Sequence, residues 1–93
     1  MLALARALML DPDVLLLDEP SASLSPKMVD SLFEKISEIN AAGTAILLVE
    51  QNAKEALSHS QRAYVLVMGE NRLDGEAASF LDNEDVAKLY LGV

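Results

Sequence analysis

Two adjacent carboxylates, Asp18 and Glu19, directly follow an apolar run at Val14–Leu17. Such a run is typical of a strand that is buried on both faces of a parallel sheet, and ligands bind at the carboxyl edge of these sheets. One carboxylate at that edge can hold Mg²⁺ through water, and the next can orient and deprotonate an attacking water. Phosphoryl transfer depends chiefly on positioning of this kind. The alternative interpretation is a polar turn that contains a chance Asp-Glu pair.

The elements that must position this pair alternate along the chain. Pro12 ends an N-terminal helix, because proline blocks its continuation. We expect strands at 14–17, 44–49 and 63–68, a return strand at 72–74, and helices at 1–10, 26–42, 53–58, 76–81 and 84–91. This order predicts an α/β fold built in layers.

Local signals mark the ends of several elements. Ser25 can cap the second helix with Pro26 in its first turn, and Gly43 can end it with a positive φ. That helix has an apolar stripe for core packing, which consists of Met28, Val29, Leu32, Phe33, Ile36 and Ile39. The segment 69–71 predicts a hairpin turn, and Gly75 is expected to interrupt the strand pattern.

Composition restricts the classes of function. The chain has 93 residues, 52% of them hydrophobic, and a formal net charge of −8. This is enough apolar material for a small core. The acidic balance argues against nucleic acid and against an anionic membrane surface as partners, because both need clustered basic residues. The absence of cysteine excludes disulfides and thiolate metal sites.

Two other polar features have simple structural interpretations. His59 is the only histidine and is expected at a solvated helix end. The acidic residues Asp82, Glu84 and Asp85 lack the spacing and the glycine of a known calcium loop. We interpret them as a solvated helix start, with Asn83 as its cap.

The motifs in their order resemble the later half of an ABC transporter ATPase. In order along the chain, the features are ARAL at 5–8 and LLLDEPS at 15–21, followed by a short loop, an amphipathic helix, a glycine and a second apolar strand. The resemblance covers residues 1–93. It implies a partial nucleotide-binding domain, the C-terminal part of a P-loop NTPase core, with a mostly parallel sheet that lacks the Walker A strand.

The resemblance also implies roles for individual residues. Val14–Asp18 is similar to the Walker B strand, so that Asp18 would assist Mg²⁺ and contact the cofactor, and Glu19 would be the catalytic base. The following loop resembles the D-loop, which crosses to the partner subunit, and its Ser21 and Ser23 are nucleotide-binding candidates. The family usually has Asp where this chain has Ser25.

The second strand resembles the one that leads to the family's switch region. The family usually has His there, and the matching residue here is Gln51, in the segment LVEQN. A glutamine amide can still donate a hydrogen bond to the terminal phosphate, but it cannot become cationic. Together with YLG at 90–92, this segment is similar to ATPase subunits of branched-chain amino acid importers.

The resemblance implies ATP and Mg²⁺ as cofactors of a full-length protein. It implies a second ATPase subunit, identical or different, and transmembrane permease subunits as partners at the cytoplasmic face of the membrane. No G-x-x-x-x-G-K-[ST] loop occurs in the chain, so we expect the isolated chain neither to bind nor to hydrolyse ATP.

In the family's fold, the Walker A strand would lie between 44–49 and 63–68, and its absence leaves unpaired strand edges. We therefore expect the isolated chain to self-associate. A non-catalytic module that binds a partner through these edges is an alternative. The net charge and the segments LVEQN and YLG count against an ABC-type ATPase of DNA repair.

Overall fold

The computed structural model describes residues 2–86 and 88 of the chain. The chain divides into two compact units, an N-terminal unit of Met1–Gln51 and a C-terminal unit of Asn52–Val93. Each unit contains one two-stranded sheet among its described residues. Within the described ranges no helix is long and apolar enough to cross a membrane.

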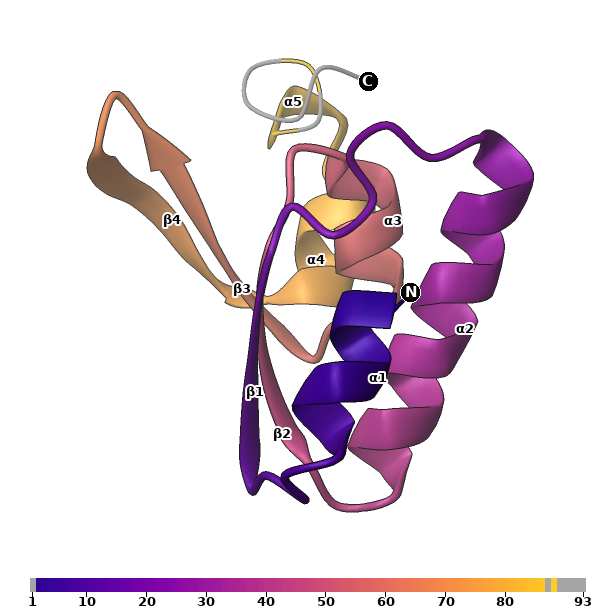
Figure 1. Ribbon diagram of the computed structural model, residues 1–93. Coiled ribbons are helices and arrows are strands. Elements are labelled where there is room, and N and C mark those ends of the chain that lie inside the picture. Colours follow the sequence, from indigo (N-terminus) through magenta and orange to yellow (C-terminus); the bar gives the residue numbers. More distant parts are fainter. Residues whose placement is uncertain (1, 87, 89–93) are drawn as a thin grey trace. The chain divides into compact units, whose positions relative to one another are not determined.

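The N-terminal unit alternates helix and strand, as its sequence predicted. Its elements are α1 (Leu2–Leu8), β1 (Val14–Asp18), α2 (Pro26–Ala41) and β2 (Ala45–Val49). The two strands run parallel, with Val14 beside Ala45 at one end and Asp18 beside Val49 at the other. The chain can return to the start of a parallel neighbour only through a crossover, which α2 supplies. Both strands therefore end at the same edge of the sheet (Figure 1).

The predicted signals of α2 are confirmed. The Ser25 hydroxyl accepts a hydrogen bond from the Met28 amide at 3.3 Å, and Pro26 occupies the first turn. Past the helix, Gly43 has a φ of +115°, a conformation that a residue with a Cβ rarely adopts. The predicted apolar stripe forms the core, with Val29, Leu32, Phe33 and Ile36 buried. Of the other two members of the stripe, Ile39 is half-buried and Met28 is exposed.

The prediction that β1 is buried on both faces is wrong for this chain. Leu15 is buried, whereas Val14 and Leu16 are 58% and 70% exposed. The alternation follows from the two helices, which cover only one face of the sheet (Figure 1). On that face Leu4, Leu17, Leu24, Ile46 and Leu48 pack against the buried residues of α2.

The C-terminal unit is built around an antiparallel hairpin. Its elements are α3 (Ala53–Ser58), β3 (Arg62–Val67), β4 (Glu70–Glu76), α4 (Ala77–Leu81) and α5 (Glu84–Val86). A small core of Leu57, Ala77 and Phe80 holds the short helices against the hairpin. The remainder of the last predicted helix lies outside the described residues, as does the segment 90–92.

The hairpin differs from its prediction in its turn and its length. The turn consists of Met68 and Gly69, which have φ values of +53° and +78°. Positive φ at both central residues matches the twist of an antiparallel pair. A register shift after Val65 accommodates one extra residue as a bulge. Gly75 does not interrupt the strand, since it pairs with Ala63 at a φ of +153°.

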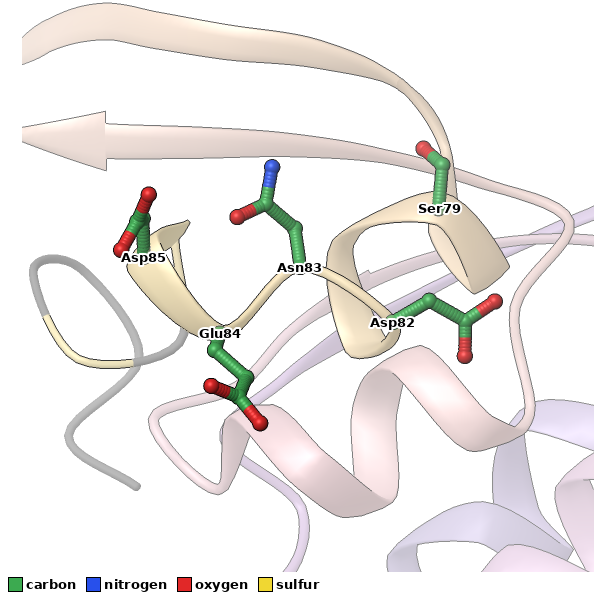
Figure 2. A pocket seen from close by; sticks show the side chains of 5 residues that line it. All are labelled: Ser79, Asp82, Asn83, Glu84 and Asp85. Carbon is green, nitrogen blue, oxygen red and sulfur yellow. The ribbon is translucent and has the colours of Figure 1, made fainter.

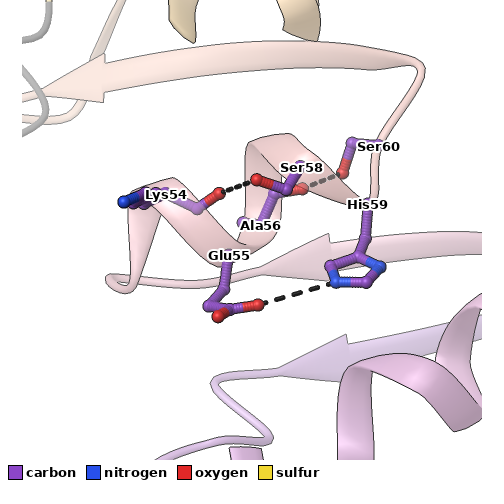
Figure 3. Close-up of polar contacts among 6 residues, drawn as sticks. All are labelled: Lys54, Glu55, Ala56, Ser58, His59 and Ser60. Atoms are coloured by element: carbon purple, nitrogen blue, oxygen red, sulfur yellow. Dashed lines mark hydrogen bonds and ion pairs between the residues drawn. The ribbon is translucent and has the colours of Figure 1, made fainter. Parts of the chain in front are cut away.

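The polar contacts that Figure 3 draws at α3 lie within one helical turn, and they confirm that His59 stands at a helix end, although its side chain is only 28% exposed. This residue caps the end of α3, and its Nε2 lies 3.5 Å from a carboxylate oxygen of Glu55, one helical turn earlier (Figure 3). Ser58 and Ser60 each donate to a backbone carbonyl four residues earlier, on Lys54 and Ala56. These contacts complete a helix end and assemble no catalytic group.

Candidate functional site

The acidic pair ends β1, where the chain leaves the sheet. Asp18 is the last residue of the strand, and both Asp18 and Glu19 are exposed. The Glu19 amide donates to the Val49 carbonyl at 2.7 Å, which extends the ladder one residue beyond β1. Glu19 has a φ of +46°, which is uncommon for a residue with a side chain. The backbone thus turns out of the sheet at the proposed catalytic base.

The loop after Glu19 is a succession of tight turns. The Ala22 amide donates to the Glu19 carbonyl at 3.2 Å, and the Leu24 amide donates to the Ser21 carbonyl at 3.1 Å. Ser23 lies exposed between them with a φ of +67°. These bonds give the six-residue stretch a defined path from β1 towards the cap of α2.

The Ser21 side chain is directed to the end of the other strand. Its hydroxyl donates to both carboxylate oxygens of Glu50, at 2.7 and 2.8 Å. Its amide donates to Glu50 Oε1 at 3.0 Å. Both residues are partly buried, and 29 positions separate them in the sequence. The structure therefore joins the loop after β1 to the residue after β2.

The same edge carries Gln51, which immediately follows Glu50 and is exposed. Because Asp18 pairs with Val49, the structure brings the backbone of Asp18, Glu19, Ser21 and Gln51 to one edge of the sheet. Ser23 lies in the same loop, but within the described part of the chain its side chain makes no bond like those of Ser21 to Glu50. The predicted site residues are therefore gathered in the N-terminal unit.

The acidic residues of this edge suit a hydrated cation better than an all-protein metal cage. Among the residues that the structure describes, no group of three or more His, Cys, Asp or Glu could hold a metal ion. In the same ranges, no ion pair engages Asp18 or Glu19. Mg²⁺ usually binds through one or two carboxylates and retains water or phosphate oxygens. A single exposed carboxylate such as Asp18 fits that requirement.

Three sequence relatives cover nearly the whole of this chain. The chain is 46% identical over 92 residues to the high-affinity branched-chain amino acid transport ATP-binding protein BraG of Pseudomonas aeruginosa. It is 44% identical to the probable branched-chain amino acid transport ATP-binding protein LivF of Archaeoglobus fulgidus. It is 39% identical to the high-affinity branched-chain amino acid transport ATP-binding protein LivG of Escherichia coli K12. These alignments cover 98–100% of the chain. The chain belongs to the ATP-binding proteins of ABC transporters.

Solved structures agree with this assignment. An ATP-binding cassette of an ABC transporter in its ADP conformation superimposes with a TM-score of 0.77 and 28% identity. The protein cbiO1 of Clostridium perfringens, part of an ABC transporter complex, gives 0.80 and 25%. These matches include 97% and 92% of this chain, but 37% and 35% of the other chains. No protein-family model matches the chain.

The chain spans about 40% of the length of the BraG and LivF relatives and 36% of LivG. It therefore represents part of an ABC ATP-binding protein, and its sheet corresponds to part of that fold. The family predicted from the sequence is confirmed, and the names of the BraG and LivF relatives agree with the predicted similarity to branched-chain amino acid transport proteins.

The contact between Ser21 and Glu50 was not predicted from the sequence of this ABC ATP-binding chain. Glu50 lies within LVEQN, but that segment was interpreted only for Gln51. A signal was present, because a carboxylate after an apolar strand can accept hydrogen bonds from a serine at the same sheet edge. Its partner could not be identified without the strand register.

A shallow pocket in the C-terminal unit contains the other acidic group. It is lined by Ser79, Asp82, Asn83, Glu84 and Asp85. Figure 2 shows the three carboxylates pointing in different directions. Asn83 accepts a hydrogen bond from the Val86 amide at 3.1 Å, as expected for a helix cap. The group therefore has the geometry of a solvated helix start.

Proposed function

We propose that this chain forms part of the ATP-hydrolysing subunit of an ABC importer for branched-chain amino acids. The observation that carries the proposal is the exposed Asp18-Glu19 pair at the edge where β1 and β2 both end. The names of the sequence relatives support the class of transported substrate. Hydrolysis would take place in a full-length protein, because this chain contains no Walker A sequence.

The two exposed carboxylates would have different roles at the phosphate end of ATP. Asp18 would hold Mg²⁺ through its water shell, and Glu19 would orient and deprotonate the attacking water. Bound ATP and Mg²⁺ supply the transferable phosphoryl group and the charge that neutralises its oxygens. The absence of a competing ion pair at either carboxylate, within the described ranges, favours these roles.

Three further residues would complete the site. Gln51 would donate a hydrogen bond from its amide to the terminal phosphate. Ser21 and Ser23 lie in the loop that would approach the nucleotide of a paired subunit. Two such subunits, identical or different, would act with permease subunits at the cytoplasmic face of the membrane.

A second proposal concerns the isolated 93-residue chain. Its parallel sheet leaves one apolar face open, with Leu16, Leu47 and Val49 exposed by 70%, 59% and 54%. Exposed apolar strands are templates for further association. We propose that the isolated chain self-associates through this sheet. A non-catalytic module that uses the same surface remains the alternative function.

Replacing Glu19 by Gln in a full-length protein that carries this segment tests the catalytic proposal. We expect ATP turnover to fall by about 10²–10⁴-fold, because the general base is lost. ATP binding should remain, since Glu19 would act on the water rather than on the nucleotide. Steady-state hydrolysis and nucleotide titration measure the two effects.

The matched control is Glu34→Gln, which removes an exposed carboxylate from α2 instead. It should leave turnover unchanged. The isolated chain should show no ATP binding in the same titration. Near-normal hydrolysis by the Glu19→Gln protein would exclude Glu19 as the base, and ATP binding by the isolated chain would contradict the need for Walker A.

A further inference from the structure

The loop that carries the proposed base is bonded at two of its residues to β2 and to the residue that follows β2. The first attachment is the hydrogen bond from the Glu19 amide to the Val49 carbonyl, at 2.7 Å. The second is the group of bonds from the Ser21 amide and hydroxyl to the Glu50 carboxylate, at 2.7–3.0 Å. Between these attachments only Pro20 intervenes, so Glu19 lies in a short segment that is held on both sides.

The backbone conformation of Glu19 requires an attachment of this kind. A residue other than glycine at a φ of +46° adopts a sparsely populated conformation, and such conformations persist only where the surroundings impose them. Pro20 fixes its own φ but donates no backbone hydrogen bond. Ser21 is therefore the first residue after Glu19 whose amide can anchor the turn.

The chemistry of Glu50 suits it as the anchor. A carboxylate accepts through both oxygens, and hydrogen bonds to a charged acceptor are stronger than neutral ones. Glu50 uses both oxygens for Ser21, and it is partly buried, so water competes less for these bonds than at an exposed side chain. Its backbone also lies directly between Val49 and Gln51.

We propose that Glu50 is a positioning residue, which acts through Ser21 to hold Glu19 and Gln51 in fixed relation at the edge of the sheet. Its carboxylate joins the D-loop to the switch segment, so a movement of either loop is transmitted to the other. The role in hydrolysis rests on the proposed function. The attachment itself does not, and it can be measured in the isolated chain.

The first measurement follows the Ser21 amide by NMR in the 93-residue chain. Glu50→Ala removes both acceptor oxygens, so the Ser21 amide should exchange with solvent about 10-fold faster or more. Glu50→Gln retains one oxygen and should restore most of the protection. Glu34→Ala, on the exposed face of α2, should leave the Ser21 amide unchanged. Equal Ser21 exchange in the wild type and in Glu50→Ala would overturn the proposal.

The second measurement follows ATP hydrolysis by the full-length protein. Glu50→Ala should lower kcat by about 10²-fold, because a small misplacement of a catalytic group has an effect of that size. KM should change little, and Glu50→Gln should recover most of kcat. Ser21→Ala should lower kcat less, since the Ser21 amide still bonds Glu50, and it should add little to Glu50→Ala.

The two measurements separate the possible failures. If Glu50→Ala frees the Ser21 amide but leaves kcat unchanged, the positioning role is wrong. Full additivity of Ser21→Ala and Glu50→Ala in kcat would also overturn it. If the wild-type full-length protein does not hydrolyse ATP, the proposed function fails, and the amide measurement alone then decides whether Glu50 anchors the loop.

Discussion

The N-terminal and C-terminal units each contain a two-stranded sheet, but the two sheets expose different surfaces. In the N-terminal unit, the open face presents apolar side chains from both strands, among them Val14, Leu16 and Leu47. In the C-terminal hairpin, exposed Tyr64 and Leu66 lie among charged residues. The charged pairs of the hairpin are Arg62 with Asp74 at 3.6 Å and Arg72 with Glu70 at 3.1 Å.

Strand direction explains why the candidate site lies in only one unit. The parallel strands β1 and β2 end at the same edge, so the residues after both strands come together there. In the hairpin, the end of β3 meets the start of β4. The segments that follow β3 and β4 therefore leave from opposite ends of the sheet. A parallel pair with a helical crossover thus assembles distant residues, whereas a hairpin joins neighbours.

Truncation of the two core phenylalanines is expected to give the largest loss of stability, and it tests whether the two units unfold separately. Phe33 is fully buried in the N-terminal unit, and Phe80 is 8% exposed in the C-terminal unit. We expect Phe33→Ala to destabilise its own unit by about 3–5 kcal/mol, through lost burial and a cavity. Amide hydrogen exchange should show lost protection in β1 and β2, with β3 and β4 affected less.

Phe80→Ala is the matched variant, and it should show the opposite pattern of exchange. In the wild type, Phe80 packs in a separate small cluster with Leu57 and Ala77. If either variant loosens all four strands equally, the units unfold as one cooperative body, and the comparison between them fails for stability.

A charge placed on the open face of the parallel sheet is expected to weaken self-association, which is a smaller effect in free energy. Leu47→Lys places a charge among apolar side chains that a second copy would bury. We expect the dissociation constant of the self-associated chain to rise by about 10–100-fold, because the burial of one leucine is worth about 1.5–3 kcal/mol. Sedimentation over a range of concentrations measures the change.

The control for this prediction is Leu66→Lys, at a position that is also exposed but lies on the charged hairpin. It should alter association less. A wild-type chain that stays monomeric over the whole concentration range would refute self-association, and equal effects of the two lysines would remove the distinction between the sheet faces.

Removal of a helix cap gives the smallest effect. Ser25→Ala should destabilise the N-terminal unit by about 1 kcal/mol, because the Met28 amide loses its acceptor. Asn83→Ala removes the corresponding bond to the Val86 amide in the C-terminal unit and should matter less for β1 and β2. Denaturant unfolding combined with amide exchange compares them, and no loss of stability in Ser25→Ala would exclude the cap as a contributor.

Several features were predictable because a few neighbouring residues determine them. The cap at Ser25, the positive φ of Gly43 and the cap at Asn83 depend on local geometry, and each is confirmed. The hairpin turn was placed one residue too late, because Met68 adopts a positive φ that its residue type does not favour. The exposure of Val14 and Leu16 was also missed, since an apolar run does not show how many faces are covered.

The sequence by itself determined the order of elements, the acidic pair after β1 and the family to which the chain belongs. These depend on residue type and on spacing along the chain. Only the tertiary structure showed that Ser21 bonds Glu50 and that Glu19 turns out of the sheet at a positive φ. The parallel register explains the Ser21–Glu50 contact, because it sets Asp18 beside Val49 and so brings together two residues that are 29 positions apart in the chain.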